Sequence, residues 1–174
     1  KAVRHFGLDS SLPTLLVTGG SKGARSINMA ILKHLDELLK MTQIIHLTGS
    51  LDIETVEQAA EKLPADKKER YHVMPYLHEM GAALAAADLV LSLVPYPYAW
   101  RYQKVNADYL AERNAAVILQ DDLLDDTLLP VINDLLANEH KRSAMRAAMK
   151  NLSQPEAADT IASQLVKLAG EETL

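Results

Sequence analysis

Residues 14–24 read TLLVTGGSKGA, a short apolar run that ends in a glycine-rich turn. A continuous apolar run of this length is typical of a strand buried in a parallel sheet. After the turn, apolar residues recur at spacings of three and four from Ala24 to Leu39, which predicts an amphipathic helix. The order strand, glycine turn, helix is the opening unit of a Rossmann-like fold.

Strand-like and helix-like segments alternate along the rest of the chain. We predict strands over 43–48, 71–74, 88–92 and 116–119, a further candidate strand over 93–96, and helices over 53–63, 78–87, 102–113, 126–137, 140–152 and 156–169. This alternation predicts a single α/β domain over residues 1–174, a doubly wound parallel sheet with helices on both faces. Ligands bind such sheets at the carboxyl ends of the strands, near the switch in strand order.

Length and composition exclude several classes of protein. The 174 residues are enough for one domain with a hydrophobic core. A net charge of −5 gives no general attraction to nucleic acid, and the absence of cysteine excludes disulfides and thiolate metal sites. Residues 1–5 lack the apolar segment of a signal peptide, and charge and prolines interrupt the longest apolar stretch, so we expect neither a signal peptide nor a membrane span.

The glycine turn is the first candidate binding site. Glycines permit positive φ and a close approach of backbone N–H groups to a ligand, and the following helix offers free amides and a positive dipole end to a diphosphate. The spacing fits neither a Walker A loop nor Gly-x-Gly-x-x-Gly, and the strand over 43–48 ends without the acid that holds a dinucleotide ribose. The alternative is a tight turn that binds nothing.

Three segments together resemble the MurG family of UDP-N-acetylglucosamine (UDP-GlcNAc) transferases: residues 19–28 (GGSKGARSIN), residues 76–80 (YLHEM) and residues 94–107, which include QKVNA. They occur in the family's order and span nearly the whole chain. The resemblance implies the C-terminal half of a two-domain GT-B glycosyltransferase, without the N-terminal acceptor domain.

The resemblance also implies a set of donor contacts. These would be Gly19, Gly20, Ser21 and Gly23 at the diphosphate, Tyr76, Leu77 and Met80 at the uracil, and Gln103 and Asn106 at the GlcNAc. Tyr102 stands where some relatives have a second Gln. UDP-GlcNAc would be a substrate, with no cofactor and no metal required. We assign no catalytic residue to this chain, because the family's general base belongs to the N-terminal domain.

The junction between Ser92 and Leu93 is unusual, because neighbouring parallel strands need a crossover of about a dozen residues. One interpretation is a single strand over 88–96. The other is a missing loop and helix, since relatives carry here a stretch resembling Arg-x-Gly-Ala-x-Thr-x-x-Glu whose Glu binds the ribose. We therefore expect the backbone to be interrupted between Ser92 and Leu93.

The implied activity is inverting transfer of GlcNAc from UDP to undecaprenyl-pyrophosphoryl-MurNAc-pentapeptide, the step from lipid I to lipid II in peptidoglycan synthesis. The lipid-linked acceptor would bind through the missing domain, and the full-length protein would be peripheral on the cytoplasmic side of the bacterial cell membrane. The isolated chain would be inactive. The alternatives are a stand-alone nucleotide-sugar-binding subunit that needs a membrane partner, a UDP-GlcNAc epimerase and a flavodoxin-like module.

Other polar clusters favour structural roles. The acids at 121, 122, 125 and 126 suit the start of a helix better than a metal site. The basic residues Lys141, Arg142, Arg146 and Lys150 form one helix face, which we expect to be solvated rather than bound to anionic lipid. The six histidines show no ligand spacing. The aromatic and proline-rich residues 95–100 suit contact with a sugar or with the missing domain.

Overall fold

The computed structural model of the chain describes residues 2–19, 23–92 and 102–171. Its centre is one parallel sheet with the strand order β3-β2-β1-β4. The strands are β1 (Thr14–Thr18), β2 (Gln43–Leu47), β3 (Tyr71–Met74) and β4 (Leu89–Ser92). The predicted α/β class and parallel sheet are confirmed.

The sheet winds in both directions from its centre. The chain moves from β1 to β2 and β3 on one side and then returns to place β4 on the other side of β1. Thr18 and Ser92 are paired at the carboxyl ends of β1 and β4. This edge is the topological switch point, where doubly wound sheets bind their ligands, and the glycine turn leaves β1 there.

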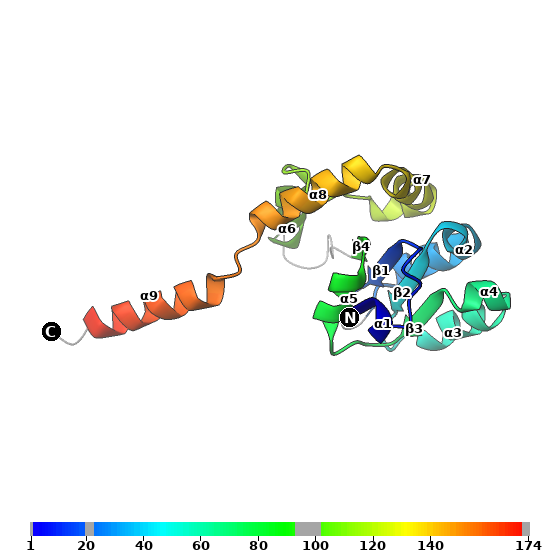
Figure 1. Ribbon diagram of the computed structural model, residues 1–174, viewed down its shortest axis with the longest axis horizontal. Helices are drawn as coiled ribbons and strands as arrows, with labels where there is room; N and C mark the ends of the chain where they lie inside the picture. The colour runs from blue at the N-terminus through cyan, green and yellow to red at the C-terminus, as the bar shows by residue number, and fades with distance from the viewer. Residues whose placement is uncertain (1, 20–22, 93–101, 172–174) are drawn as a thin grey trace.

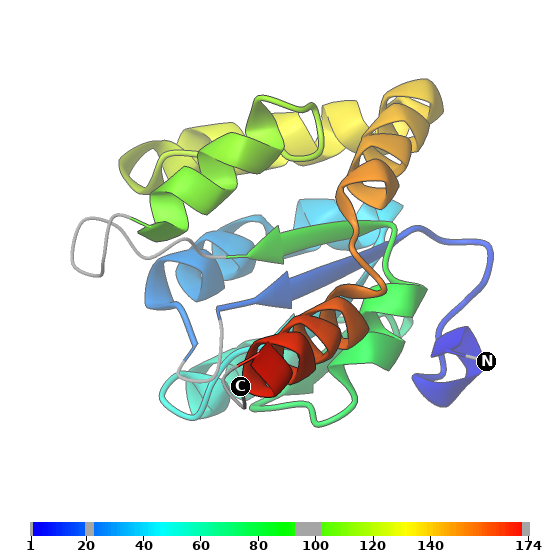
Figure 2. The same cartoon turned by 90° about the vertical axis from the view of Figure 1, so that its left-hand side faces the viewer.

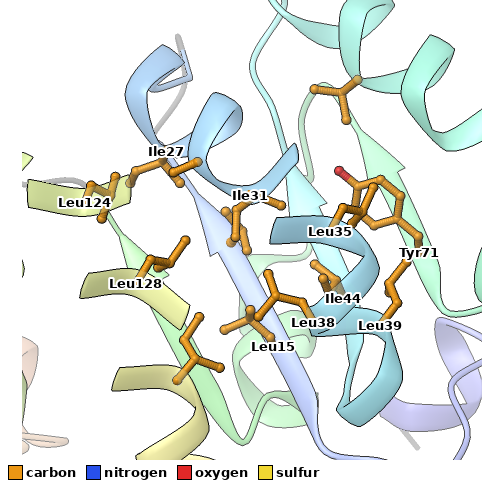
Figure 3. Close-up of a cluster of buried hydrophobic side chains, with 14 of the residues drawn as sticks. Leu15, Ile27, Ile31, Leu35, Leu38, Leu39, Ile44, Tyr71, Leu124 and Leu128 are labelled. Carbon is orange, nitrogen blue, oxygen red and sulfur yellow. The ribbon is translucent and has the colours of Figure 1, made fainter. Parts of the chain in front are cut away.

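Helices cover the two faces of the sheet, as Figure 1 shows. The helices α2 (Arg25–Met41), α3 (Ile53–Glu61) and α7 (Leu124–Ala137) contribute to the larger core on one face, which is drawn in Figure 3. There Leu15, Ile31 and Leu128 lie between the sheet, α2 and α7. The helices α1 (Ala2–His5) and α5 (Met80–Ala86) cover the other face, against Leu16 and Ile45. Neighbouring residues of β1 point to opposite faces, as the period of a strand requires.

The remaining elements are α4 (Ala65–Lys68), α6 (Tyr102–Ala111), the 3-10 helix η1 (Asp121–Leu123), α8 (Glu139–Leu152) and α9 (Ala157–Glu171). Helix α8 packs on α7, and the Arg142 guanidinium donates hydrogen bonds to the carbonyls of Leu135 and Leu136 near the end of α7. Helix α9 extends away from the rest of the molecule in Figure 1, and Figure 2 views the molecule from the side of α9.

The predicted strand over 116–119 is wrong. These residues have no regular secondary structure, and Val117 and Ile118 are 45% and 40% exposed. Within the described parts of the chain, β4 pairs with β1 and with no second strand. Residues 116–119 thus form no ladder hydrogen bonds with β4, and an apolar run alone does not make a strand without them. The candidate strand over 93–96 and the expected interruption after Ser92 lie outside the described residues.

Candidate functional site

The glycine turn between β1 and α2 is closely packed at both of its described ends. A β-carbon at Gly19 would overlap the backbone of Gly23 and Ala24, so the turn closes on itself. Gly23 has a φ of 80°, and a β-carbon there would overlap the carbonyl oxygen of Thr48. Both positions therefore require glycine for steric reasons, and Gly23 requires it for its left-handed backbone conformation as well.

The start of α2 keeps the features expected of an anion site. Its N-cap residue is Ala24, whose side chain cannot accept a hydrogen bond from the first amides of the helix, and the first turn contains no acidic residue. The first helical residue, Arg25, pairs with Asp52 at 2.5 Å. The guanidinium side chain is 73% exposed while the carboxylate is 4% exposed. A helix start with uncapped amides attracts negative charge.

The turn after β2 joins the glycine turn to the loop after β3. Gly23 packs against Thr48 and Gly49, the two residues that follow β2. On the other side, the Thr48 amide donates to the Met74 carbonyl at 3.0 Å and the Gly49 amide donates to the Pro75 carbonyl at 3.1 Å. The glycine turn, the turn after β2 and the loop after β3 thus lie side by side at the carboxyl edge of the sheet, each in contact with the next.

The loop after β3 contains the predicted residues Tyr76, Leu77 and Met80. Leu77 and Met80 are half-buried and pack against the smaller core. Tyr76 is 55% exposed, and its ring meets that of His78 edge to face, with centroids 5.0 Å apart. The loop is therefore anchored by its apolar residues and presents an aromatic ring to solvent.

A buried polar cluster lies where α2, β2 and β3 meet near the glycine turn. It contains Asn28, His46, the hydroxyl of Tyr71 and Asp52, all of them buried. Burial lowers the pKa of His46 to about 4, against a smaller opposing effect of the Asp52 charge, so the imidazole is neutral at pH 7. Burial also raises the pKa of the Tyr71 hydroxyl.

The structure brings together part of the predicted site. Gly19, Gly23, Tyr76, Leu77 and Met80 gather at one edge of the sheet. Gly20 and Ser21 lie outside the described residues. Gln103 and Asn106 belong to α6, where Asn106 is exposed and the side chain of Gln103 is outside the description. Helix α6 follows directly after residues 93–101, which lie outside the described residues.

Sequence patterns alone did not single out Thr48, Gly49 or the Asn28 cluster. The signal was present, because Asn28 follows Ile27 on the buried face of an amphipathic helix and His46 lies between the apolar residues Ile45 and Leu47 of a buried strand. Buried polar side chains need partners. Because α2 and β2 are consecutive elements, a hydrogen bond between Asn28 and His46 could have been predicted from these two signals.

The other charged clusters are engaged within the fold. Asp125 pairs with Lys33 at 2.7 Å, and the residues that the structure describes contain no group of acids and histidines able to hold a metal. On α8, Lys141 pairs with Asp134 at 2.5 Å and Arg146 with Asp88 at 3.6 Å. Across residues 2–19, 23–92 and 102–171, each helix is too short or too polar to cross a lipid bilayer.

A hollow of about 410 Å³ lies between α2 and α3, lined by Leu32, Asp36, Gln58 and Lys62 among others. None of its lining residues belongs to the glycine turn or to the loop after β3. We do not assign it to the candidate site.

Comparison with known proteins gives consistent results. Residues 14–92 match the family described as the glycosyltransferase family 28 C-terminal domain. Proteins named UDP-N-acetylglucosamine--N-acetylmuramyl-(pentapeptide) pyrophosphoryl-undecaprenol N-acetylglucosamine transferase are similar over nearly the whole chain. The protein of this name from Chlorobium limicola is 38% identical over 189 residues, covering 97% of this chain and 50% of the relative. That from Roseiflexus is 40% identical over 196 residues, covering 90% and 44%.

The fold comparison agrees. The crystal structure of Acinetobacter baumannii MurG superposes with a TM-score of 0.67 at 22% identity, covering 95% of this chain and 53% of that one. This chain spans about half the length of the relatives that it matches. The aligned spans of 189 and 196 residues exceed its 174 residues, so the relatives contain residues without a counterpart here. The chain belongs to the MurG family, of which it represents the C-terminal, glycosyltransferase family 28 domain.

Proposed function

We propose that this chain is the donor-binding half of an N-acetylglucosaminyltransferase that transfers GlcNAc from UDP-GlcNAc to a lipid-linked muramyl-pentapeptide acceptor. One observation carries the proposal. The glycine turn leaves β1 at the switch point beside β4 and is linked through Thr48 and Gly49 to the loop that presents Tyr76. The uncapped start of α2 and an exposed aromatic ring at the same edge of the sheet suit a diphosphate joined to a nucleoside.

The diphosphate would bind at the glycine turn. Negative charge grows on the departing UDP as the bond to the sugar breaks. The uncapped amides at the start of α2 would stabilise that charge, and loss of one such donor in comparable sites costs about 3–4 kcal/mol. The proposed reaction requires no metal, because backbone amides and the helix dipole supply the stabilisation.

The uridine and the sugar would occupy the two sides of the turn. The ring of Tyr76 would cover the uracil, the backbone of Leu77 would bond to its edge, and Met80 would line the same pocket. Gln103 and Asn106 would hold hydroxyls of the GlcNAc. The exposure of Tyr76 and the anchoring of Leu77 and Met80 support this arrangement.

The remaining half of the relatives' length would supply the rest of the enzyme. We infer that it holds the acceptor site and the general base that deprotonates the acceptor hydroxyl, and that the complete protein works at the cytoplasmic face of the bacterial membrane. Since relatives are about twice as long as this chain, the isolated chain should catalyse no transfer.

Titration of the chain with UDP-GlcNAc, UDP-GalNAc and ADP, followed by thermal unfolding, tests the proposal. A ligand at about 100 times its dissociation constant adds about 2.7 kcal/mol of stability. We expect UDP-GlcNAc to raise the melting temperature far more than ADP at equal concentration. Equal shifts with the two nucleotides would eliminate the uridine assignment, and the absence of any shift would eliminate the proposed function.

A further inference from the structure

The buried cluster around Asn28 has only one consistent hydrogen-bond arrangement. The Asn28 side-chain nitrogen lies 2.9 Å from both the Thr48 carbonyl and a carboxylate oxygen of Asp52. Both partners are acceptors, so each takes one of the two amide protons. The Asn28 carbonyl oxygen is then an acceptor for His46 Nε2, which lies 2.9 Å away and must carry a proton.

The remaining bond follows from this assignment. A neutral imidazole has one protonated nitrogen, so Nδ1 of His46 is an acceptor, and the Tyr71 hydroxyl donates to it at 2.7 Å. Donors and acceptors thus run in one direction from Tyr71 through His46 and Asn28 to Thr48 and Asp52. The lowered pKa of His46 agrees with a neutral ring held in this tautomer.

The chain of bonds ends at the two groups that border the glycine turn. The Thr48 carbonyl that Asn28 holds is the group against which Gly23 packs. The Asp52 carboxylate that Asn28 holds also binds the guanidinium of Arg25, the first residue of α2. Asn28 lies on the first turn of that same helix, so its side chain ties the start of α2 to the end of β2 and, through His46, to Tyr71 of β3.

The chain contains another buried amide side chain with several hydrogen bonds, Gln43, with which Asn28 can be compared. Gln43, at the opposite end of β2, shares the two protons of its side-chain nitrogen among the Asp9 carbonyl, the Leu12 carbonyl and the Thr14 hydroxyl, and its side-chain oxygen accepts from the Asp9 amide. It is as buried and as heavily bonded as Asn28, but it lies at the amino ends of the strands. A substitution of Gln43 therefore shows the effect of losing any buried hydrogen-bond network, and a substitution of Asn28 shows the additional effect of losing the network beside the glycine turn.

We propose that Asn28 is a positioning residue for phosphate binding, which sets Gly23 and the start of α2 against the Thr48 carbonyl and does not itself touch the ligand. The inference rests on the proposed function, because it requires a diphosphate to bind at the turn. A misplacement of about 1 Å can lower the rate of an enzyme reaction by about 100-fold, and by the same geometric sensitivity a shift of Gly23 should weaken the phosphate contacts. The loop that presents Tyr76 is held by backbone hydrogen bonds that do not involve Asn28.

The test compares Asn28→Ala with Gln43→Ala, using UDP and uridine as probes. Both variants should lose stability, because each leaves buried partners unpaired. Only Asn28→Ala should lose affinity for UDP, by about tenfold or more, while its weak affinity for uridine, measured by NMR titration, should be retained. Equal losses of UDP affinity in the two variants, or unchanged UDP affinity in Asn28→Ala, would overturn the inference.

A measurement on the unaltered chain covers the case in which Asn28→Ala does not fold. UDP should shift the NMR signals of the Asn28 side-chain amide and the His46 ring, uridine should shift them much less, and the Gln43 side-chain amide should respond to neither. If UDP binds and leaves the Asn28 and His46 signals unmoved, the inference fails while the proposed function stands. If the chain binds no UDP, the proposed function fails and the inference falls with it.

Discussion

At the scale of single residues, Gly23 is the most constrained position of the candidate site. An alanine there would have to keep a left-handed conformation, which costs about 1–2 kcal/mol, and its β-carbon would overlap the Thr48 carbonyl. We expect Gly23→Ala to lower the free energy of unfolding by more than about 2 kcal/mol and to abolish nucleotide binding. Gly81 in α5 has open space around it, so Gly81→Ala should be neutral or stabilising. Denaturant unfolding of the two variants checks this, and equal effects would contradict it.

His46 should make stability depend on pH. Its pKa is about 4 in the folded chain and near 6.5 when unfolded, so between these values the unfolded chain binds more protons. The contribution is fully present above about pH 6.5 and is lost as the pH falls to 4, an effect of about 3 kcal/mol. Burial lowers the pKa of His72 as well, which acts in the same direction.

Unfolding by urea at a series of pH values from 7 to 4 measures this effect. A His46→Gln variant is the control, because it lacks the buried imidazole and should show a shallower slope over this range. Equal slopes for the variant and the unaltered chain would show that His46 does not titrate as described.

At the scale of elements, the pattern of apolar residues along the chain predicted most of the helices and strands, because local sequence controls where they form. The bounds of β1 and β3 agree with the prediction, and the helices differ from it by a few residues at their ends, where fraying and capping decide. The strand over 116–119 was predicted from its apolar run alone, whereas a strand forms only where a partner strand offers its hydrogen bonds. Two short helices, α1 and α4, are too brief to give a periodic pattern.

The segment between β4 and α6 leads to a prediction about the ribose. The sequence passes directly from Ser92 to Leu93, where the resemblance to the family implies a further stretch with a glutamate that would bind the ribose hydroxyls. We expect the chain to bind UDP and 2′-deoxy-UDP with affinities within about threefold of each other, a difference below about 1 kcal/mol. A preference for UDP of a hundredfold in calorimetric titrations would show that another residue holds the ribose.

At the scale of the whole molecule, α9 contributes little to the stability of the domain. The described residues from Ser153 to Gly170 are all exposed, among them the apolar side chains of Ile161, Leu165 and Leu168. We expect a chain that ends at Ser153 to unfold within about 0.5 kcal/mol of the full chain, since exposed residues contribute little. A chain that ends at Ala137 is the control, because it also loses Arg142 and the ion pair between Arg146 and Asp88. Its stability should fall clearly, and a comparable fall on removal of α9 alone would contradict the account.

The candidate site could be predicted from the sequence only in part, because some of its residues are adjacent in the sequence and others meet only in the folded chain. The glycine turn and the Tyr76 loop are each contiguous, so their residues can be read along the chain. The cluster of Asn28, His46 and Asp52 forms only when α2 and β2 pack together and the turn before α3 closes on them. Contacts of this kind depend on the register of the sheet, which the pattern of apolar residues does not specify.

The most direct test of the central claim is a crystal structure of this chain with UDP bound. We expect the diphosphate to accept hydrogen bonds from the backbone amides at the glycine turn and the start of α2, with the uracil beside Tyr76. A diphosphate bound elsewhere, or a turn whose amides are occupied by the protein's own side chains, would contradict it.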